Sequence, residues 1–354
     1  MRAARYHGPE DVRIEEIESR PLESNELRVD VAACGICGSD LHEYAAGPIT
    51  VPEEPHPVTG ESLPLRLGHE IGGTVAEVGE DVDLAEGTTV AINPIIYCGE
   101  CRYCDQGDYH LCDSNGFVGL SGAGGGFAEE IVVDAERVVP VPDGVPPELA
   151  ALVEPFTVGL HAIHQSGLEA GDAVAVFGSG PIGLTVVQAA RAAGAGPIFV
   201  SEPNDARREL AAECGADVLI DPIEDDPEAQ IVDEIGRHAD VAFEVAGIEA
   251  TVNQAIRATK PGGTTVIVSL FEETVAIHPN DLVMKERTLV GTAAFEGGPL
   301  SGREFETTIR NIATGDLDPE LLVTSRIDLE NLVDDGFEQL LADDNEHVKI
   351  LVRP

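Results

Sequence analysis

The sequence predicts an α/β protein with two domains, one a doubly wound parallel sheet and the other rich in β-strands. From about residue 151, apolar strand-like runs alternate with alanine-rich helical stretches, which is the pattern of a parallel sheet covered by helices. Residues 1 to about 150 instead contain short β-type runs between glycines and prolines, which favours a barrel-like β domain. A chain of 354 residues is long enough for both.

The expected elements can be placed in order along the chain. In the β-rich part, strands are expected at 27–33, 72–79, 88–94 and within 128–142. In the second part, strands are expected at 173–177, 198–202, 217–220, 240–245 and 264–270, and helices ending at glycine at 181–194, 204–215 and 249–263. The C-terminal residues are of mixed type and are expected to rejoin the first domain. The predicted domains are therefore 1–152 with 296–354, and 153–295.

Acidic residues dominate the composition. The chain has 65 Asp and Glu against 21 Lys and Arg, a formal net charge of −44, and lysine only at Lys260, Lys285 and Lys349. Because 43% of the residues are hydrophobic, the chain is expected to fold, with the excess charge on its surface. We interpret this charge as adaptation to a salt-rich cytoplasm, since salt screens the repulsion; an acidic protein of ordinary habitat is the alternative. The negative field also argues against nucleic-acid binding.

Neither a membrane segment nor a signal peptide is expected. No apolar run reaches the roughly 20 residues that a membrane span needs, and the first residues, MRAARYHGPEDVRIEE, contain no apolar signal region. We therefore expect a cytoplasmic protein with no membrane partner, in a compartment that keeps thiols reduced.

Four cysteines on one short loop indicate a structural zinc site. Cys98, Cys101, Cys104 and Cys112 are spaced C-x2-C-x2-C-x7-C. Four thiolates can close a tetrahedral shell around Zn²⁺ and leave no position for a substrate. An iron–sulfur cluster is a less suitable interpretation, because the bacterial ferredoxin run has its fourth cysteine four positions after the third, with a proline behind it. Disulfides are the other alternative, although the total of seven cysteines is odd.

A glycine-rich loop indicates a dinucleotide site. The run AVAVF is followed by Gly178, Ser179, Gly180, Pro181, Ile182 and Gly183, and then by a predicted helix. In this G-x-G-x-x-G pattern the glycines allow a tight turn, close approach to a pyrophosphate and close helix–strand packing, with the phosphates on the helix N-terminus.

Glu202 bears on the choice of cofactor. It ends the next predicted strand, 19 residues after Gly183, where a carboxylate would accept a hydrogen bond from a ribose 2′-OH and repel a 2′-phosphate. NAD is therefore favoured. Arg207 could line the adenosine pocket or, with Arg208, pair with a phosphate, which keeps NADP as an alternative. Val245, at the end of the run DVAFEV, is predicted to be a further cofactor contact.

Three other segments complete a family resemblance. They are CGICGSDLH (34–42), GHE (68–70) and EPFTVGLHA (154–162). With the four-cysteine loop and GSGPIG, their order resembles that of zinc-dependent medium-chain alcohol dehydrogenases over nearly the whole chain. Within that family the chain is most similar to 2,3-butanediol dehydrogenases, also called acetoin reductases, in 42–64, 116–129, 240–247, 277–288 and the terminal VKILVRP.

The resemblance implies a fold, a reaction and individual roles. It implies a GroES-like catalytic domain, a Rossmann-type NAD-binding domain, two zinc ions per subunit and hydride transfer between a secondary alcohol and NAD. Cys37 and His69 would bind a catalytic zinc, with Glu70 and Glu154 as acidic ligands, although Glu70 could equally be a supporting carboxylate. The remaining implied roles belong to Asp40, which would orient His69, and to Ser39 and His42, which would form a proton relay. Cys34 and Cys214 are expected to be buried rather than ligating.

The substrate remains open within this resemblance. 2,3-Butanediol and acetoin are expected, with sorbitol, threonine, glucose or a simple secondary alcohol as alternatives. A non-catalytic NAD(P)H-binding regulator on the same fold is an alternative of another class, but it would be expected to lose zinc ligands. The expected partners are a small alcohol or ketone and further copies of the chain, as a dimer or tetramer.

Overall fold

The chain folds into two compact units in the computed structural model, which describes residues 1–299, 303–342 and 345–354. The first unit comprises Met1–Glu154, Glu296–Ala313 and Val323–Pro354, and the second comprises Pro155–Phe295 and Thr314–Leu322. The domain boundaries expected from the sequence place 314–322 in the first domain, whereas the structure places it in the second unit. A reciprocal pair of hydrogen bonds holds it there: Gln188 Nε2 donates to the Asp318 carbonyl at 3.1 Å, and Asp318 N donates to Gln188 Oε1 at 2.7 Å. Within the expected range 296–354, residues 300–302 and 343–344 lie outside the described part.

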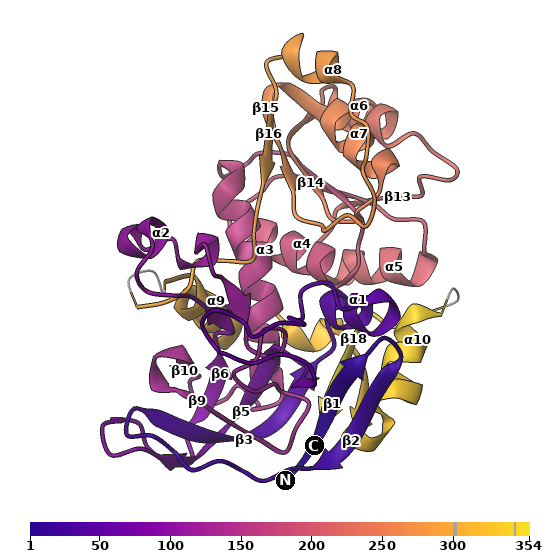
Figure 1. The fold of residues 1–354 in the computed structure, drawn as a ribbon. Helices are drawn as coiled ribbons and strands as arrows, with labels where there is room; N and C mark the ends of the chain where they lie inside the picture. The colour runs from indigo at the N-terminus through magenta and orange to yellow at the C-terminus, as the bar shows by residue number, and fades with distance from the viewer. Residues whose placement is uncertain (300–302, 343–344) are drawn as a thin grey trace. The chain divides into compact units, whose positions relative to one another are not determined.

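The second unit contains the predicted parallel sheet (Figure 1). Its strands are β11 (Val174–Phe177), β12 (Ile198–Ser201), β13 (Val218–Ile220), β14 (Ala239–Glu244), β15 (Thr259–Ile267) and β16 (Thr288–Gly291). They pair in the order β13-β12-β11-β14-β15-β16, and every pair is parallel. The strand order reverses between β11 and β14, and in such sheets ligands bind outside the carboxyl ends of the strands at that point.

The helices of this region connect successive strands. They are α3 (Val153–Ser166), α4 (Pro181–Ala192), α5 (Asp205–Glu213), α6 (Pro227–Ile235), α7 (Glu249–Ala258) and α8 (Pro279–Val283). The helix expected over 249–263 ends at Ala258, and β15 begins at once. Pro261 explains the difference, since the residue before a proline is disfavoured in helical conformation. The region 181–267 otherwise follows the predicted alternation, with α6 added between β13 and β14.

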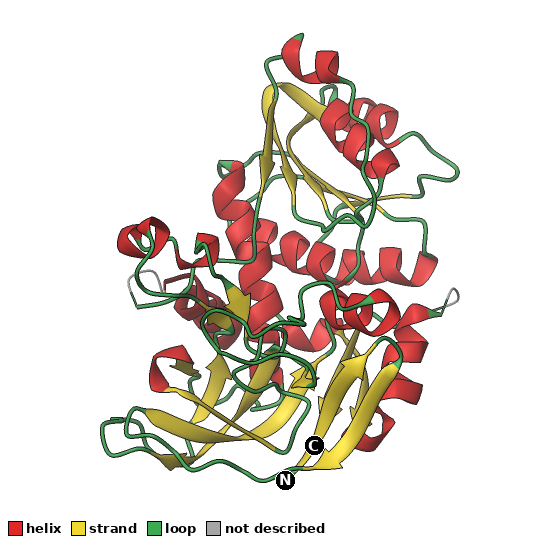
Figure 2. Ribbon diagram, in the orientation of Figure 1, coloured by secondary structure: helices red, strands yellow, loops and turns green. Residues whose placement is uncertain are grey.

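The first unit is built mainly from strands (Figure 2). They are β1 (Arg2–Gly8), β2 (Asp11–Glu16), β3 (Glu26–Gly35), β4 (Leu65–Arg66), β5 (Glu70–Val78), β6 (Thr89–Ile92), β7 (Ile95–Ile96), β8 (Gly116–Phe117), β9 (Glu130–Asp134), β10 (Val138–Pro140), β17 (Val323–Asp328) and β18 (Lys349–Arg353). One sheet has the order β10-β6-β5-β3-β18-β17, with β9 also paired to β3, and another has the order β2-β1-β4. The expected strand region 128–142 is thus two strands separated by a 3-10 turn.

The C-terminal strand is integral to this unit. β18 runs antiparallel to β3, with Leu351 opposite Gly35, and parallel to β17. Four helices accompany the strands: α1 (Gly38–Ala46), α2 (Arg102–Gln106), α9 (Arg303–Thr314) and α10 (Glu338–Leu341). Aromatic side chains pack in the core, where the Phe337 ring lies 6.0 Å from Phe127 and 5.2 Å from Tyr44. Among the described residues, no helix combines the length and apolarity needed to cross a membrane.

Candidate metal and cofactor sites

The four cysteines of the 98–112 loop converge on one point. Their Sγ atoms all lie within 4.8 Å of one another. Cys101 precedes α2, Cys104 lies inside it, and Cys112 follows a 3-10 turn, so the short helix folds the loop back on itself. The Sγ atoms of Cys101 and Cys104 are 3.6 Å apart, and those of Cys112 and Cys98 are 3.5 Å apart. A disulfide needs about 2.05 Å, whereas a tetrahedral zinc with Zn–S near 2.3 Å places its sulfurs about 3.8 Å apart.

Backbone amides in the same loop point at the sulfurs. Cys98 N and Ser114 N both donate to Cys112 Sγ at 3.3 Å. Amides of the loop around Cys101 lower the pKa of that thiol to about 6. Hydrogen bonds of this kind favour thiolates, which are the form that binds metal, whereas burial raises the pKa of Cys104 to about 12 and also raises that of Cys112. The donor set, its spacing and these amides fit a structural Zn²⁺.

A second group of candidate ligands lies at the start of α1 and β5. Single ligand atoms of Cys37, His69 and Glu70 lie within 4.8 Å of one another. Cys37 is the N-cap of α1, and its side chain forms a capping box with Asp40. Asp40 completes the cap by accepting from Cys37 N at 3.0 Å, and its other oxygen accepts from Gly68 N at 3.3 Å. The same oxygen lies 3.8 Å from His69 Nδ1, so this one buried carboxylate ties together the two segments that carry the ligands.

Glu70 is held by a buried lysine. Lys349, on β18, is 1% exposed, and its Nζ donates to both oxygens of Glu70, at 2.6 and 2.9 Å, and to the Ile36 carbonyl at 2.8 Å. Burial alone would lower the pKa of the Lys349 ammonium, but the Glu70 charge raises it above its usual value. An ammonium therefore already neutralises the Glu70 carboxylate, which favours a supporting role over direct ligation.

Glu154 lies near the group of Cys37, His69 and Glu70, and the pKa values of Glu154 and His69 are linked. Glu154, in the first turn of α3, is buried but lies outside the 4.8 Å group. Burial raises the pKa of Glu154 to about 7, while the charge of His69 opposes that rise. Burial would lower the pKa of His69, yet Cys37, Asp40 and Glu154 together raise it well above its usual value. The surplus of negative charge around the buried His69 fits a bound dication.

Ser39 and His42 share one face of α1. Ser39 Oγ lies 3.5 Å from His69 Nε2, which places the hydroxyl beside the candidate metal position. His42 is half-buried three residues further along the helix, and residues three apart are neighbours on a helix surface.

The glycine loop lies between β11 and α4, at the point where the sheet order reverses. Gly178 has φ +102°, a left-handed conformation that favours glycine, and a Cβ on Gly183 would stand 2.1 Å from the Gly178 carbonyl oxygen. A Cβ on Gly180 would meet nothing within 4 Å, so this residue opens onto free space at the N-terminus of α4. The remaining members of the predicted loop, Ser179, Pro181 and Ile182, follow the same turn.

A cavity of about 550 Å³ opens beside this loop. Gly178, Gly180, Glu202, Arg207 and Val245 all line it. Parallel register brings the ends of β11, β12 and β14 level, with Phe177 beside both Ser201 and Glu244. The structure therefore gathers these predicted cofactor residues around one space.

Glu202 is fixed in orientation inside this cavity. Ser179 N donates to its Oε2 at 2.8 Å and Asn204 N donates to its Oε1 at 3.0 Å, which leaves that second oxygen able to accept another bond. Arg208 is directed elsewhere, pairing with Asp205 and lying 3.7 Å from Asp221. The buried Nε of Arg207 has no hydrogen-bond partner among the described residues. A carboxylate with a spare acceptor and an unpaired guanidinium nitrogen fit the adenosine end of a nicotinamide dinucleotide.

Comparison with known proteins identifies the family of the chain. Residues 23–143 match the alcohol dehydrogenase GroES-like domain, and residues 181–314 match the zinc-binding dehydrogenase family. An (R,R)-butanediol dehydrogenase of Bacillus subtilis is 44% identical over 357 residues, covering 100% of both chains. One from Neisseria gonorrhoeae is 38% identical over 363 residues, covering 100% of this chain and 99% of the relative. The chain belongs to the zinc-dependent medium-chain alcohol dehydrogenase family.

Solved structures support the same assignment of this dehydrogenase. The crystal structure of 2R,3R-butanediol dehydrogenase from Bacillus subtilis has a TM-score of 0.93 at 44% identity and covers 100% of this chain and 99% of that one. A structure from Sinorhizobium meliloti bound to NADP has a TM-score of 0.89 at 32% identity, with 100% and 99% coverage. The predicted family, fold class and oxidoreductase activity are thus confirmed, as is the need for zinc and a nicotinamide cofactor.

The other two cysteines of this dehydrogenase, Cys34 and Cys214, are buried and lie outside both groups of candidate zinc ligands, as expected.

The residue that sequence reasoning missed is Lys349. The signals that the sequence offers for Lys349 are its scarcity, as one of three lysines, and its place in the terminal run VKILVRP.

Proposed function

We propose that this dehydrogenase interconverts 2,3-butanediol and acetoin, with NAD as hydride acceptor and donor. The observation that carries the proposal is the similarity of 44% identity over the full chain to an (R,R)-butanediol dehydrogenase. The first unit, Met1–Glu154 with Glu296–Ala313 and Val323–Pro354, would form the catalytic domain, and the second, Pro155–Phe295 with Thr314–Leu322, the NAD-binding domain. The relatives also include a sorbitol dehydrogenase of Bacillus subtilis at 34% identity and an L-threonine 3-dehydrogenase of Pyrococcus abyssi at 32%, so these substrates belong in any test.

The proposal includes two zinc sites per subunit. Cys98, Cys101, Cys104 and Cys112 would hold a structural ion, and Cys37, His69 and Glu154 a catalytic one, with Glu70 supporting them through its ion pair with Lys349. A catalytic zinc supplies a Lewis acid that polarises the substrate oxygen and lowers the pKa of its hydroxyl. NAD, when bound, supplies the hydride acceptor.

The protein's own residues would guide the proton. Ser39 Oγ, beside His69 Nε2, is placed to accept the proton of the substrate hydroxyl, and His42, on the same face of α1, to pass it to solvent. In the reverse direction, the same two groups would return a proton to the carbonyl oxygen of acetoin. Asp40 would act through His69, by fixing the segment that carries it.

The preference for NAD would depend on Glu202. Its Oε1 has room for one more hydrogen bond, which a ribose 2′-OH could donate, while a 2′-phosphate would be repelled. The engagement of Arg208 with Asp205 and Asp221 leaves Arg207 as the cation facing the cavity. Truncating Glu202 to alanine should weaken kcat/KM for NAD by roughly ten- to a hundredfold, since a hydrogen bond to a charge contributes about 1.5–3 kcal/mol. A wild type that prefers NADP would contradict this.

A kinetic panel at high salt tests the function as a whole. The three stereoisomers of butanediol, acetoin, sorbitol and threonine are assayed with NAD and with NADP. The highest kcat/KM is expected for a butanediol isomer with NAD. A higher kcat/KM for sorbitol or threonine would show that the proposed substrate is wrong. A non-catalytic regulator would bind the cofactor without turnover of any compound, and metal analysis showing fewer than two zinc ions per subunit would contradict the zinc assignment.

We further propose a homo-oligomer in a salt-rich cytoplasm. β16 is the last strand in the order of its sheet, and no described strand pairs with its outer edge. The nearby Val283 and Met284 are 69% and 74% exposed. An open edge next to apolar side chains suits pairing with a second copy. Sedimentation in high salt that gives a monomer mass would contradict the oligomer.

A further inference from the structure

A pocket in the first unit, separate from the metal ligands, is lined by arginines. Its volume is about 290 Å³, and Arg5, Arg20 and Arg66 contribute to its wall. Arg5 lies on β1 and Arg66 on the short strand β4, and the antiparallel register places the two directly opposite each other. Like charges directly opposite in an antiparallel pair are destabilising, because their side chains lie on the same face of the sheet. The arrangement therefore needs a compensating charge.

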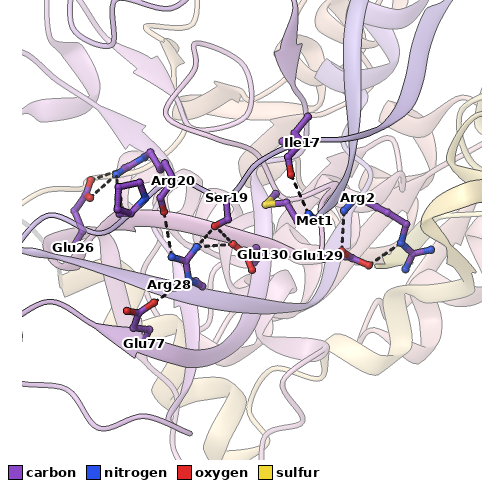
Figure 3. A network of polar contacts seen from close by, with 11 residues as sticks. Met1, Arg2, Ile17, Ser19, Arg20, Glu26, Arg28, Glu77, Glu129 and Glu130 are labelled. Carbon is purple, nitrogen blue, oxygen red and sulfur yellow. Dashed lines mark hydrogen bonds and ion pairs between the residues drawn. The ribbon is translucent and has the colours of Figure 1, made fainter.

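The arginines around Arg66 already have carboxylate partners. Arg5 pairs with Glu15 at 3.3 Å, Arg20 with Glu26 at 2.5 Å, and Arg28 with Glu130 at 2.5 Å. Figure 3 shows the last two pairs in one polar network that also joins Arg2 to Glu129. Arg66 differs, since its guanidinium makes no hydrogen bond or ion pair within the described residues.

The carboxylates nearest to Arg66 are directed elsewhere. Glu61 Oε1 accepts from Ala123 N at 3.0 Å, and Glu130 Oε1 accepts from Arg28. Arg66 is only partly accessible and lies against the 124–126 glycines, where a Cβ on Gly124 would stand 3.1 Å from Arg66 Nη2. Burial lowers the pKa of the Arg66 guanidinium, and the charges of Arg20 and Arg5 lower it further, against the opposing effect of Glu61 and Glu130. In a chain with net charge −44, Arg66 is thus a half-buried cation without an acidic partner.

We propose that this pocket binds one small inorganic anion, with Arg66 as its principal ligand. A guanidinium offers five N–H donors in a fixed fork that suits oxyanions, and all of those on Arg66 are free of protein acceptors. Arg5 and Arg20 also line the pocket, although each already has a carboxylate partner. Three carboxylates, Glu18, Glu61 and Glu130, also line the pocket and limit its positive charge, which favours a single small anion over a polyanion.

The anion would also stabilise the segment of the chain that leads from β4 to His69. β4 ends at Arg66, three residues before His69. Offsetting the charge of Arg66 relieves its repulsion of Arg5 and so strengthens the β1–β4 pairing that leads into this segment. The effect expected is on stability rather than on the chemistry, because none of these arginines belongs to the metal or cofactor groups.

Thermal unfolding of wild type and Arg66→Gln tests the proposal. Sucrose keeps the low-salt protein folded without adding an anion, and millimolar sodium phosphate, sulfate or chloride is then titrated in. The melting temperature of the wild type should rise by about 2–4 °C once one of these anions exceeds its Kd about tenfold, by mass action. Arg66→Gln should lack this saturable rise. The anion with the lowest Kd in calorimetry identifies the occupant.

Arg237→Gln is the matched control. Arg237 lies in the second unit, is 49% exposed in its side chain and pairs with Asp240 at 2.6 Å, so the variant removes the same charge outside the pocket and should keep the response. General screening would act equally on all three proteins. No saturable response in the wild type, or the same response in Arg66→Gln, would overturn the proposal. If Arg66→Gln fails to fold, the calorimetric titration of the wild type decides alone, and no saturable heat with any of the three anions overturns it.

Discussion

Lys349 shows how a single buried side chain can set the role of another. A carboxylate with no exposed surface would be costly to keep ionised, and the ammonium at 2.6 and 2.9 Å offsets that cost. Both oxygens of Glu70 are therefore already engaged by Lys349, next to Cys37 and His69. The sequence leaves two roles open for Glu70, and this contact favours the supporting one.

Removing one partner of this pair should be strongly destabilising. Lys349→Met leaves an uncompensated buried carboxylate, and we expect it to lower the free energy of unfolding by about 3–5 kcal/mol. Adding Glu70→Gln should recover part of that loss, because the unpaired charge is then gone. The measurement is a double-mutant cycle by denaturant unfolding of the zinc-loaded protein.

Lys260→Met is the control for that cycle. Lys260 is 42% exposed and pairs at 2.5 Å with Asp240, which is 7% exposed but keeps a second cation, Arg237, at 2.6 Å, so the loss of Lys260 should cost clearly less than that of Lys349. Strictly additive effects of Lys349→Met and Glu70→Gln would contradict the coupling.

The same contact marks a limit of sequence reasoning. Cys37, His69 and the four loop cysteines lie in short motifs whose residue types and spacing already indicate metal binding. Lys349 is 279 residues away from Glu70 and reaches it only because β18 pairs with β3. No local periodicity encodes that register, and so the residue could be found only in the folded chain.

At the scale of elements, the turn from β11 to α4 separates glycines needed for folding from one left for a ligand. A Cβ on Gly183 would overlap the Gly178 carbonyl oxygen at 2.1 Å, whereas one on Gly180 would meet no atom within 4 Å. The sequence predicts this turn correctly because the motif is local. It misplaces the start of β15, where Pro261 ends a helical pattern early, and it leaves out α6.

Substituting these two glycines should therefore have different results. Gly183→Ala should destabilise the second unit by several kcal/mol or prevent its folding, because backbone must move to accept the new Cβ. Gly180→Ala should keep the melting temperature within about 1 °C of wild type but raise KM for NAD, since its Cβ would occupy space that the pyrophosphate needs. Melting curves without cofactor and NAD titrations measure the two effects. A Gly180→Ala protein with unchanged KM would contradict the assignment.

The two groups of candidate zinc ligands also belong to different elements, and removing a ligand from each should have different effects on stability and turnover. Cys101→Ala opens the 98–112 loop and should lower the melting temperature by several degrees while folded molecules still turn over. Cys37→Ala should leave the fold intact and lower kcat by more than about a hundredfold, because even partners of metal ligands cost 10–100-fold. Metal content, melting temperature and kcat are measured on each purified variant. Normal kcat in Cys37→Ala would show that the catalytic assignment is wrong.

At the scale of the whole molecule, charge is the dominant feature. Acidic residues outnumber basic residues about three to one, 65 against 21. Many of the arginines are already paired with a carboxylate, as in Arg20–Glu26 and Arg28–Glu130. The remaining carboxylates repel one another over distances set by the ionic strength. Pairwise contacts in the fold cannot relieve this repulsion, because too few basic residues exist to meet it.

Salt should therefore stabilise the enzyme over a wide range. The Debye length is about 30 Å at 0.01 M salt, so carboxylates across a whole unit repel, and about 3 Å at 1 M, where only neighbours do. We expect the melting temperature to rise steadily from dilute buffer to molar KCl, and activity lost on dialysis to return in part when salt is restored. Screening alone predicts equal effects of NaCl and KCl at equal concentration, whereas specific cation binding to the carboxylates would separate the two curves. A melting temperature that stays flat or falls across the series would show that the acidic surface is not an adaptation to salt.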